Sequence, residues 1–112
     1  MIDIYTLAAQ LGFETDEVAM LIEMFLETAQ ESMDALHAAI ALEDFDAIQK
    51  SAHSIKVSAA DLTLESVYLK ARELETLAKE KTPDDYTLLC NELHEMLESI
   101  GHLTVSQSVE LV

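Results

Sequence analysis

Apolar residues recur every three or four positions along most of the chain, which is the period of an α-helix that buries one face. A short stretch of this kind ends near Gly12, with Asp3 as its expected N-cap, and four longer stretches follow. Each stretch predicts one amphipathic helix. The residues expected to face inward are Ile4, Leu7, Ala8 and Leu11 in the first helix; Val18, Ile22, Phe25, Ala29, Met33, Leu36 and Ile40 in the second; Ile48, Ala52, Ile55, Ala59 and Leu62 in the third; Val67, Ala71, Leu74, Leu77 and Ala78 in the fourth; and Tyr86, Leu89, Leu93, Met96, Leu97 and Ile100 in the fifth.

Cap residues predict where the longer helices begin. The second helix is expected to start at Thr15 or Asp16, and the fourth near Leu64 or Glu65. The segment LEDFD interrupts the pattern before the third helix, and its Asp44 is a good N-cap because the side chain can accept a hydrogen bond from a free backbone N–H. The connections between the helices are therefore short.

The last helix has the clearest start signal. Thr82 is the expected N-cap, Pro83 stands at the first helical position, and Asp85 closes a capping box. Gly101 is the expected C-cap. Residues 101–112 are expected either to add a short helix or to fray.

The composition agrees with a helical fold. Two glycines and one proline in 112 residues are too few for a turn-rich β fold, and 50% of the residues are hydrophobic. Ala, Leu, Glu and Met, which favour helices, dominate. Because short connections make neighbouring helices antiparallel, residues 1–112 are predicted to form one all-α domain. The expected architecture is an antiparallel up-down-up-down four-helix bundle with a short extra N-terminal helix.

The net charge of −16 narrows the classes of partner. It argues against nucleic acids and anionic membranes, because both carry charge of the same sign. All six basic residues lie within residues 50–81, so an anion is best tolerated there. The chain shows no membrane-spanning run, no secretory signal and only one cysteine, which excludes an internal disulfide and suits the cytoplasm. The high charge favours a monomer.

His53 is predicted to stand on the solvent side of the third helix. With about 100° of rotation per residue, it points roughly 140° away from the mean direction of the inward stripe. Gln49 and Ala60 lie on the same side, Lys56 follows one turn along, and Val57 points outward. The expected neighbours of His53 are thus a lysine and small or apolar residues rather than carboxylates.

Exposed histidines on helices are common and usually have no function, but this setting favours one. Neutral imidazole is a nucleophile, and an ordinary pKa near 6.5 leaves the ring largely neutral at cellular pH. Lys56 can offset the charge of a phosphoryl group on the ring, and no acidic residue lies between Asp46 and Asp61. The pattern predicts receipt of a phosphoryl group, for which positioning and charge compensation are the main requirements.

Other candidate sites are weaker. His94 and Glu98 have i, i+4 spacing and could hold a metal, but no third ligand lies in register. His37 lies among acids, and Cys90 is best explained as a small apolar residue at a helix flank. The chain lacks a Gly-rich phosphate loop, a CxxC pair and a serine–histidine–acid signature. We therefore predict no resident metal and no cofactor.

The segment AHSIKVSAADL resembles the signature of histidine-containing phosphotransfer (HPt) domains, roughly A-H-x-L-K-G-S-A-x-x-L-G, and the resemblance extends over about residues 3–100. It implies a four-helix bundle, without kinase activity of its own, that carries phosphoryl groups between receiver-domain aspartates in two-component relays. Any Mg²⁺ would come with the receiver. The resemblance also implies that His53 is the acceptor and Lys56 the phosphate partner, and Gln49, one turn before, can hydrogen-bond the group. The matching residues are Ala52, His53, Ile55, Lys56, Ser58, Ala59 and Leu62.

Two positions depart from the family pattern. Val57 stands where the family usually has glycine, and its bulk can narrow the approach to the imidazole or provide a docking contact. Thr63 stands near a second favoured glycine and is expected to change only how the helix ends. A docking surface for a receiver or sensor kinase is expected around His53 on the second and third helices, including Lys50, Val57 and Ala60.

Three functions follow from these residues. The leading hypothesis is a phosphocarrier that both accepts and donates phosphoryl groups. The alternative is a phosphorylation-incompetent module that docks a receiver or sensor kinase, as a consequence of Val57. The third is a structural bundle that oligomerises through exposed apolar residues.

Overall fold

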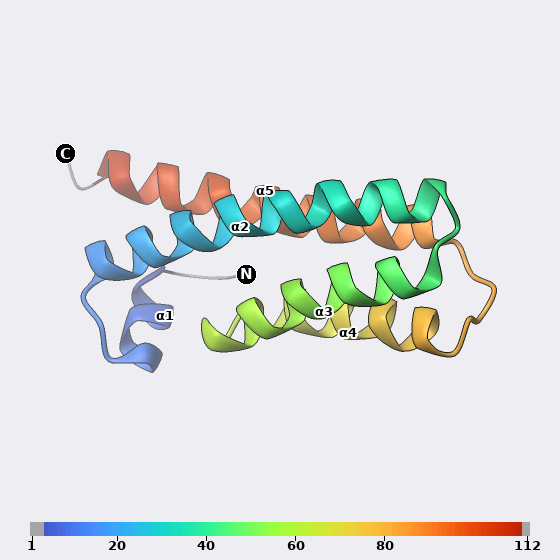
Figure 1. Cartoon of the computed structure of the whole chain (residues 1–112). Coiled ribbons are helices and arrows are strands. Elements are labelled where there is room, and N and C mark those ends of the chain that lie inside the picture. Colours follow the sequence, from blue (N-terminus) through green and yellow to red (C-terminus); the bar gives the residue numbers. More distant parts are fainter. Residues whose placement is uncertain (1–3, 111–112) are drawn as a thin grey trace.

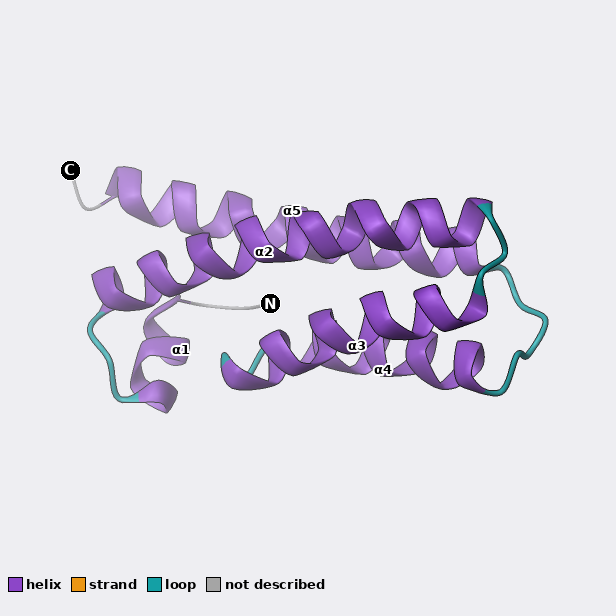
Figure 2. Cartoon of the chain, in the orientation of Figure 1, coloured by secondary structure: helices purple, strands orange, loops and turns teal. Residues whose placement is uncertain are grey.

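The structure is a computed structural model that describes the backbone of residues 4–110 and the side chains of residues 4–101. All regular elements in this part of the chain are α-helices (Figure 2), which confirms the predicted all-α fold. Asp3, the expected N-cap of the first helix, lies outside the described residues. The helices are α1 (Ile4–Leu11), α2 (Thr15–Ala41), α3 (Phe45–Asp61), α4 (Glu65–Lys79) and α5 (Tyr86–Glu110).

The four longer helices form one bundle. Successive helices from α2 to α5 run in alternating directions along its long axis (Figure 1). Helices α2 and α4 each contact both α3 and α5, so the four helices surround a single core. The short helix α1 packs against α2 and α5 at the end of the bundle where α2 begins.

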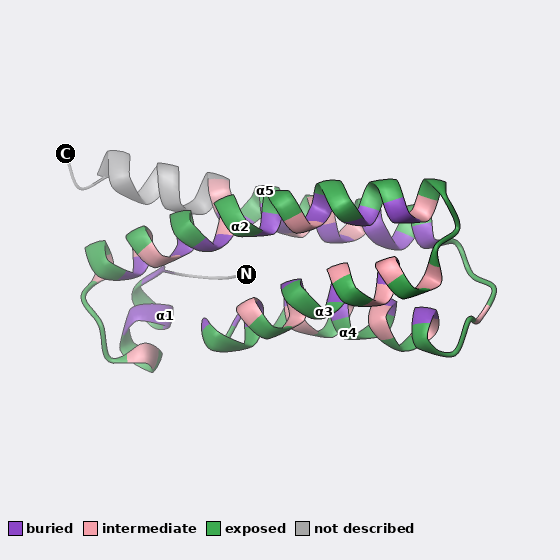
Figure 3. Ribbon diagram, viewed as in Figure 1, coloured by how far each residue is buried: buried purple, intermediate pink, exposed green. Residues whose placement is uncertain are grey.

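The predicted inward stripes form this core, and Figure 3 shows the buried positions on the faces that the helices turn toward one another. Because each residue advances the helix by about 100°, positions at the edge of a stripe are only partly covered. Leu11, Ile40, Leu77 and Met96 are such half-buried positions. Ala39 and Cys90, which flank the predicted stripes, are buried instead.

Helices α2 to α4 begin where the sequence predicts. At the start of α2, the carboxylate of Glu17 accepts a hydrogen bond from the backbone N–H of Glu14 at 3.0 Å. At the start of α3, the Asp44 side chain accepts from the backbone N–H of Ala47 at 3.2 Å, which confirms Asp44 as the N-cap. These bonds satisfy N–H groups that the first turn of a helix leaves without partners.

The predicted start of the last helix is wrong. Thr82 and Pro83 precede α5, which begins at Tyr86. The carboxylate of Asp85 accepts from the backbone N–H of Leu88 at 3.0 Å, so it caps the helix itself rather than closing a box with Thr82. The Tyr86 hydroxyl donates to the carbonyl of Thr82 at 2.6 Å and holds the preceding segment across the helix start. Thr82 and Asp85 could both act as caps, and the structure uses the later one.

The predicted end of the last helix is also wrong. Helix α5 continues to Glu110, so Gly101 is an interior residue rather than a C-cap, and the segment after it is helical as far as the backbone is described. A Cβ atom at Gly101 would lie 3.6 Å from Cδ1 of Leu26, an ordinary contact. Packing against α2 lets the helix continue through a residue that lacks intrinsic helix preference. Residues 111–112 lie outside the description.

Non-glycine residues with positive φ are found in three connections: Glu43, Thr63 and Lys81, with φ of 53°, 56° and 54°. Glycine usually occupies this left-handed position after a helix. In the α3–α4 connection, the N–H of Leu64 closes the turn on the carbonyl of Ala59 at 2.9 Å. Thr63 therefore ends α3 in the way a glycine would, but with a β-branched side chain that this backbone region disfavours.

Candidate functional site

His53 lies near the middle of α3, on its outer side. The side chain is 57% exposed, while the stripe residues beside it, Ala52 and Ile55, are buried. Its solvent-facing position, predicted from the helical period, is confirmed. The helix itself is rigidly held, because its opposite face forms part of the core. The ring is thus presented to solvent from a fixed backbone.

A carboxylate from α4 bridges His53 and Lys56. Oε2 of Glu75 lies 2.5 Å from Nδ1 of His53, and Oε1 of the same carboxylate accepts a hydrogen bond from Nζ of Lys56 at 2.7 Å. The expectation that the neighbours of His53 would not be carboxylates is therefore wrong. Helix α3 supplies no nearby acid, but the antiparallel neighbour does.

The bridge is well shielded except at the histidine. The side chains of Lys56 and Glu75 are 20% and 15% exposed. Burial alone would raise the pKa of Glu75, but the hydrogen bonds from Lys56 and His53 outweigh it and hold the pKa below its ordinary value of 4.5. The carboxylate is consequently ionised at neutral pH and keeps its two partners in place.

This geometry distinguishes the two ring nitrogens of His53. A carboxylate can only accept, so an Nδ1–H donates to Glu75 in the neutral ring and the lone pair lies on Nε2. Among the described residues, none is within hydrogen-bonding distance of Nε2. A nucleophilic nitrogen therefore faces solvent, with the ammonium group of Lys56 close by. The arrangement suits covalent transfer of an anionic group to Nε2.

A shallow hollow lies beside the ring between α3 and α4. Gln49 and Lys50 line it together with His53, so the structure brings both of these predicted residues to the site. The remaining lining residues are Asp46, Ser54 and Glu75.

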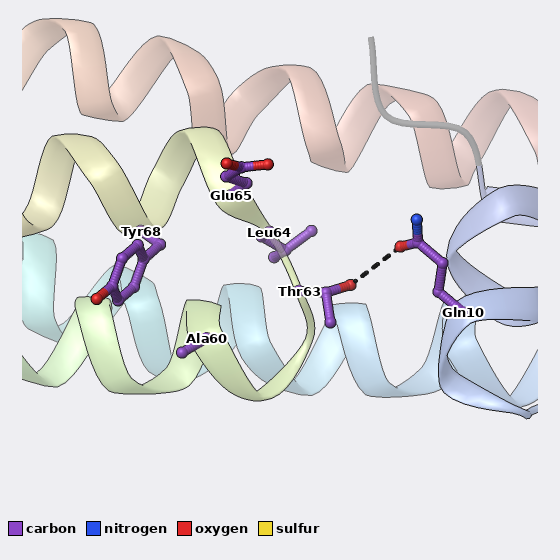
Figure 4. A pocket seen from close by; sticks show the side chains of 6 residues that line it. All are labelled: Gln10, Ala60, Thr63, Leu64, Glu65 and Tyr68. Carbon is purple, nitrogen blue, oxygen red and sulfur yellow. Dashed lines mark hydrogen bonds between the residues drawn. The ribbon is translucent and has the colours of Figure 1, made fainter.

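The other predicted docking residues, Val57 and Ala60, lie further along the outer face of α3. Val57 is 46% exposed, one turn along α3 from His53, and lies open to solvent. Ala60 instead borders a second hollow, at the end of the bundle where Gln10 of α1 meets the α3–α4 connection (Figure 4). There the hydroxyl of Thr63 donates to the side-chain oxygen of Gln10 at 3.4 Å. The remaining lining residues are Leu64, Glu65 and Tyr68.

The other histidines have simpler surroundings. Nε2 of His94 lies 3.0 Å from Glu98 within α5, an i, i+4 pair at the surface. Sγ of Cys90 is 3.6 Å from Nδ1 of His37, and burial raises the pKa of this thiol, which favours its neutral form. Within the described part of the chain, no three His, Cys, Asp or Glu side chains are grouped to hold a metal. No described helix is long and apolar enough to cross a membrane.

Glu75 is the site residue that the sequence reasoning missed, although a signal for it exists. The residue follows Leu74 of the inward stripe in the fourth helix and so lies at the edge of the core. A short connection makes the third and fourth helices antiparallel, and counting outward from it places residue 53 opposite residues 73–75. A carboxylate at such an edge needs a partner, and Lys56 with His53 provides it.

Comparison with known proteins adds family and fold. The family model described as "Hpt domain" matches residues 20–102, a span that includes α3 and α4. The fold is similar to the crystal structure of histidine-containing phosphotransfer protein B from Pseudomonas aeruginosa, with a TM-score of 0.81 and 23% sequence identity. The match covers 95% of this chain and 92% of that one. No match is found among curated proteins.

Proposed function

The chain belongs to the Hpt domain family, the phosphotransfer carriers of two-component signalling, and on that premise we propose that His53 is its phosphoryl acceptor. The observation that carries the proposal is the bridge: an exposed imidazole with Nδ1 held by Glu75 and with Lys56 beside it. The partner is the receiver domain of a response regulator or of a hybrid sensor kinase.

Transfer to the ring needs no proton to move. The Nε2 lone pair attacks the phosphorus of a receiver aspartyl phosphate, the P–O bond breaks, and its electron pair stays on the aspartate carboxylate. The ring then carries the phosphoryl group on Nε2 and a hydrogen on Nδ1, which Glu75 stabilises as positive charge develops. Donation reverses these changes and returns a neutral imidazole.

Lys56 offsets negative charge in both states. Before transfer it neutralises Glu75, which would otherwise repel an incoming phosphoryl group. After transfer its ammonium group lies within reach of both anions. Gln49 lines the same hollow and can donate its amide N–H groups to phosphoryl oxygens. The proposed carrier depends on kinases and receivers to activate the phosphoryl group.

The proposal is tested by phosphoryl uptake on the folded protein. Wild type and His53→Gln are incubated with phosphoramidate and, separately, with a phosphorylated receiver domain and Mg²⁺, and intact mass is read at neutral to alkaline pH. We expect one acid-labile phosphoryl group on wild type and none on the variant, with equal helicity by circular dichroism. His94→Gln is the matched control and retains full uptake.

The opposite results have distinct meanings. Labelling that survives in His53→Gln would remove His53 from the acceptor role. A folded wild type that takes up nothing from either donor would favour the docking module, with Val57 restricting access to the ring. In that case Val57→Gly, which restores the family's usual residue, should recover uptake if access alone is limiting.

A further inference from the structure

Asp46 contributes a carboxylate to the hollow beside His53 that the proposed transfer does not use. The other carboxylate of the hollow, Glu75, is held by Lys56 and His53. Among the described residues, by contrast, no cation lies within 4.0 Å of the Asp46 carboxylate and no group donates a hydrogen bond to it. Lys50 has the i, i+4 spacing of a helical ion pair, but the two side chains do not form one. The Asp46 carboxylate is therefore free to accept a hydrogen bond from water.

Asp46, Gln49 and His53 lie in one row along the outer face of α3. Their spacing of three and four residues places them on successive turns, and Asp46 points within about 20° of His53 around the helix axis. Side chains of a helix lean toward its N-terminus, so the ring of His53 leans over the turn that contains Gln49. The hollow lies on this side of the ring, because Asp46, Gln49 and Lys50 all precede His53. A phosphoryl group on Nε2 would then lie between the ring and Asp46.

The length of this row leaves room for one water molecule. Asp46 and His53 are about 10.5 Å apart along the helix axis, since each residue rises about 1.5 Å. The imidazole and its phosphoryl group occupy most of this length. An attacking oxygen must lie about 3–3.5 Å from phosphorus and opposite Nε2, which is the end of the hollow nearest Asp46.

We propose that the phosphorylated carrier also hydrolyses its own phosphohistidine, with Asp46 orienting the attacking water and accepting its proton. This rests on the proposed function and adds a second activity at the same ring. The water oxygen forms a bond to phosphorus, the bond between phosphorus and Nε2 breaks, and its electron pair returns to Nε2 as the ring lone pair. One water proton passes to Asp46, inorganic phosphate leaves, and the neutral imidazole keeps the hydrogen on Nδ1.

This activity returns His53 to its acceptor state without a receiver domain. Because the transition state of phosphoryl transfer is loose, the bond to water is little formed when the barrier is crossed. A proton acceptor then contributes less than the factor of a hundred or more that is usual for general bases, and we expect an effect of about tenfold. The lifetime of the phosphoryl group is thus set by Asp46 as well as by the encounter with a receiver.

The test measures the lifetime of the isolated phosphoprotein. Wild type, Asp46→Asn and Asp61→Asn are phosphorylated with phosphoramidate, freed of the donor, and followed by intact mass at neutral to alkaline pH in water and in D2O. Asp61 is the last residue of α3 and lies outside the hollow, so its variant is the control for an equal change of charge. We expect a half-life about tenfold longer in Asp46→Asn and a wild-type half-life in Asp61→Asn.

The comparison between water and D2O separates proton transfer from a simple effect of charge. Wild type should lose its phosphoryl group more slowly in D2O, and this difference should disappear in Asp46→Asn. Asp46 also lies in the first turn of α3, where a carboxylate favours the helix, so urea unfolding checks the stability of each variant. Asp46→Glu keeps both the charge and a proton acceptor, and it should restore part of the hydrolysis rate and the slowing in D2O.

Three outcomes would overturn the inference. Equal half-lives in wild type and Asp46→Asn would exclude Asp46 from hydrolysis and leave His53 as the acceptor. A longer half-life in Asp46→Asn with an unchanged D2O effect would show that Asp46 acts through its charge alone. A folded wild type that takes up no phosphoryl group would remove the proposed function and this inference with it.

Discussion

The two halves of the bundle each contain a histidine next to a glutamate, but the pairs are built differently. In the α3–α4 half, Glu75 reaches His53 from the neighbouring helix and also binds Lys56. In the α2–α5 half, Glu98 reaches His94 from one turn away on the same helix. The carboxylate side chains are 15% and 60% exposed, respectively.

This difference shows why only one pair suits a reaction. A surface pair with i, i+4 spacing is worth a few tenths of a kcal/mol, so thermal motion and water readily separate its members. A shielded carboxylate held between two helices fixes the orientation of the imidazole and the nitrogen that carries the hydrogen. Preorganisation of this kind, rather than the presence of a histidine and an acid, distinguishes the α3–α4 half.

Removing each carboxylate tests this contrast most severely. Glu75→Ala should slow phosphoryl uptake from phosphoramidate on the order of a hundredfold, because the ring loses the partner that fixes its orientation. Glu98→Ala should leave the rate unchanged. Initial rates by intact mass provide the measurement, with circular dichroism to confirm folding.

The conservative variant Glu75→Gln refines this result. Its amide oxygen can still accept from Nδ1–H, so most of the orientation returns, but the charge is lost. Uptake should recover to roughly fivefold below wild type, since a hydrogen bond to a charged group is worth about 1 kcal/mol more than one to a neutral group. Equal rates in the alanine and glutamine variants would show that Glu75 acts by charge alone.

Lys56→Gln probes the other arm of the bridge. Without the ammonium group, Glu75 repels the phosphoryl group, and we expect uptake to slow about tenfold and the phosphohistidine to have a shorter lifetime. The α2–α5 half offers no equivalent cation, so Lys70→Gln is the matched control. It breaks the ion pair with Glu92 of α5 and the one with Glu73 of α4, and it should leave uptake unchanged. A Lys56 variant with wild-type rate and lifetime would exclude Lys56 from the mechanism.

The pH dependence of stability compares the pairs without any phosphoryl chemistry. Folding lowers the pKa of Glu75 below 4.5, so the bridge stabilises the folded state above that pH and loses this contribution as the pH falls through the lowered value. The difference in unfolding free energy between wild type and Glu75→Gln should be about 1–2 kcal/mol at pH 7 and should shrink toward zero in acid. Urea unfolding at several pH values measures it. A difference that stays constant with pH would contradict the assignment.

The sequence predicts much of this molecule because its strongest signals are local. The helical period identifies the inward stripes and places His53 on the outside of α3, since both depend only on positions within one helix. The helix Thr15–Ala41 and the cap Asp44 are predicted for the same reason. The stripes also supply the order and direction of the helices, because the connections are too short for other arrangements.

What the sequence reasoning missed depends on contacts between helices. The partner of His53 is 22 positions away on a helix whose rotation the third helix does not reveal. The error at Gly101 has the same origin, because its local preference for ending a helix loses to packing against α2. The error at Thr82 is different, since one local arrangement replaces another: Asp85 caps the helix, and the Tyr86 hydroxyl donates to the carbonyl of Thr82 four residues away.

One residue in each half has a backbone conformation that another residue type would favour, and changing these two residues gives the smallest predicted effects. Thr63, in the α3–α4 half, has a φ of 56°, which glycine adopts freely and a β-branched residue does not. Gly101, in the α2–α5 half, lies inside a helix, where alanine is favoured. Thr63→Gly should stabilise the fold by about 1 kcal/mol and Gly101→Ala by up to about 1 kcal/mol, measured by urea unfolding. Because a Cβ at Gly101 meets Leu26 at an ordinary 3.6 Å, the alanine introduces no clash.

Neither change touches the bridge of His53, Glu75 and Lys56, so phosphoryl uptake should remain at the wild-type rate. A stabilised Gly101→Ala variant with altered uptake would show that the site depends on more of the bundle than the α3–α4 half.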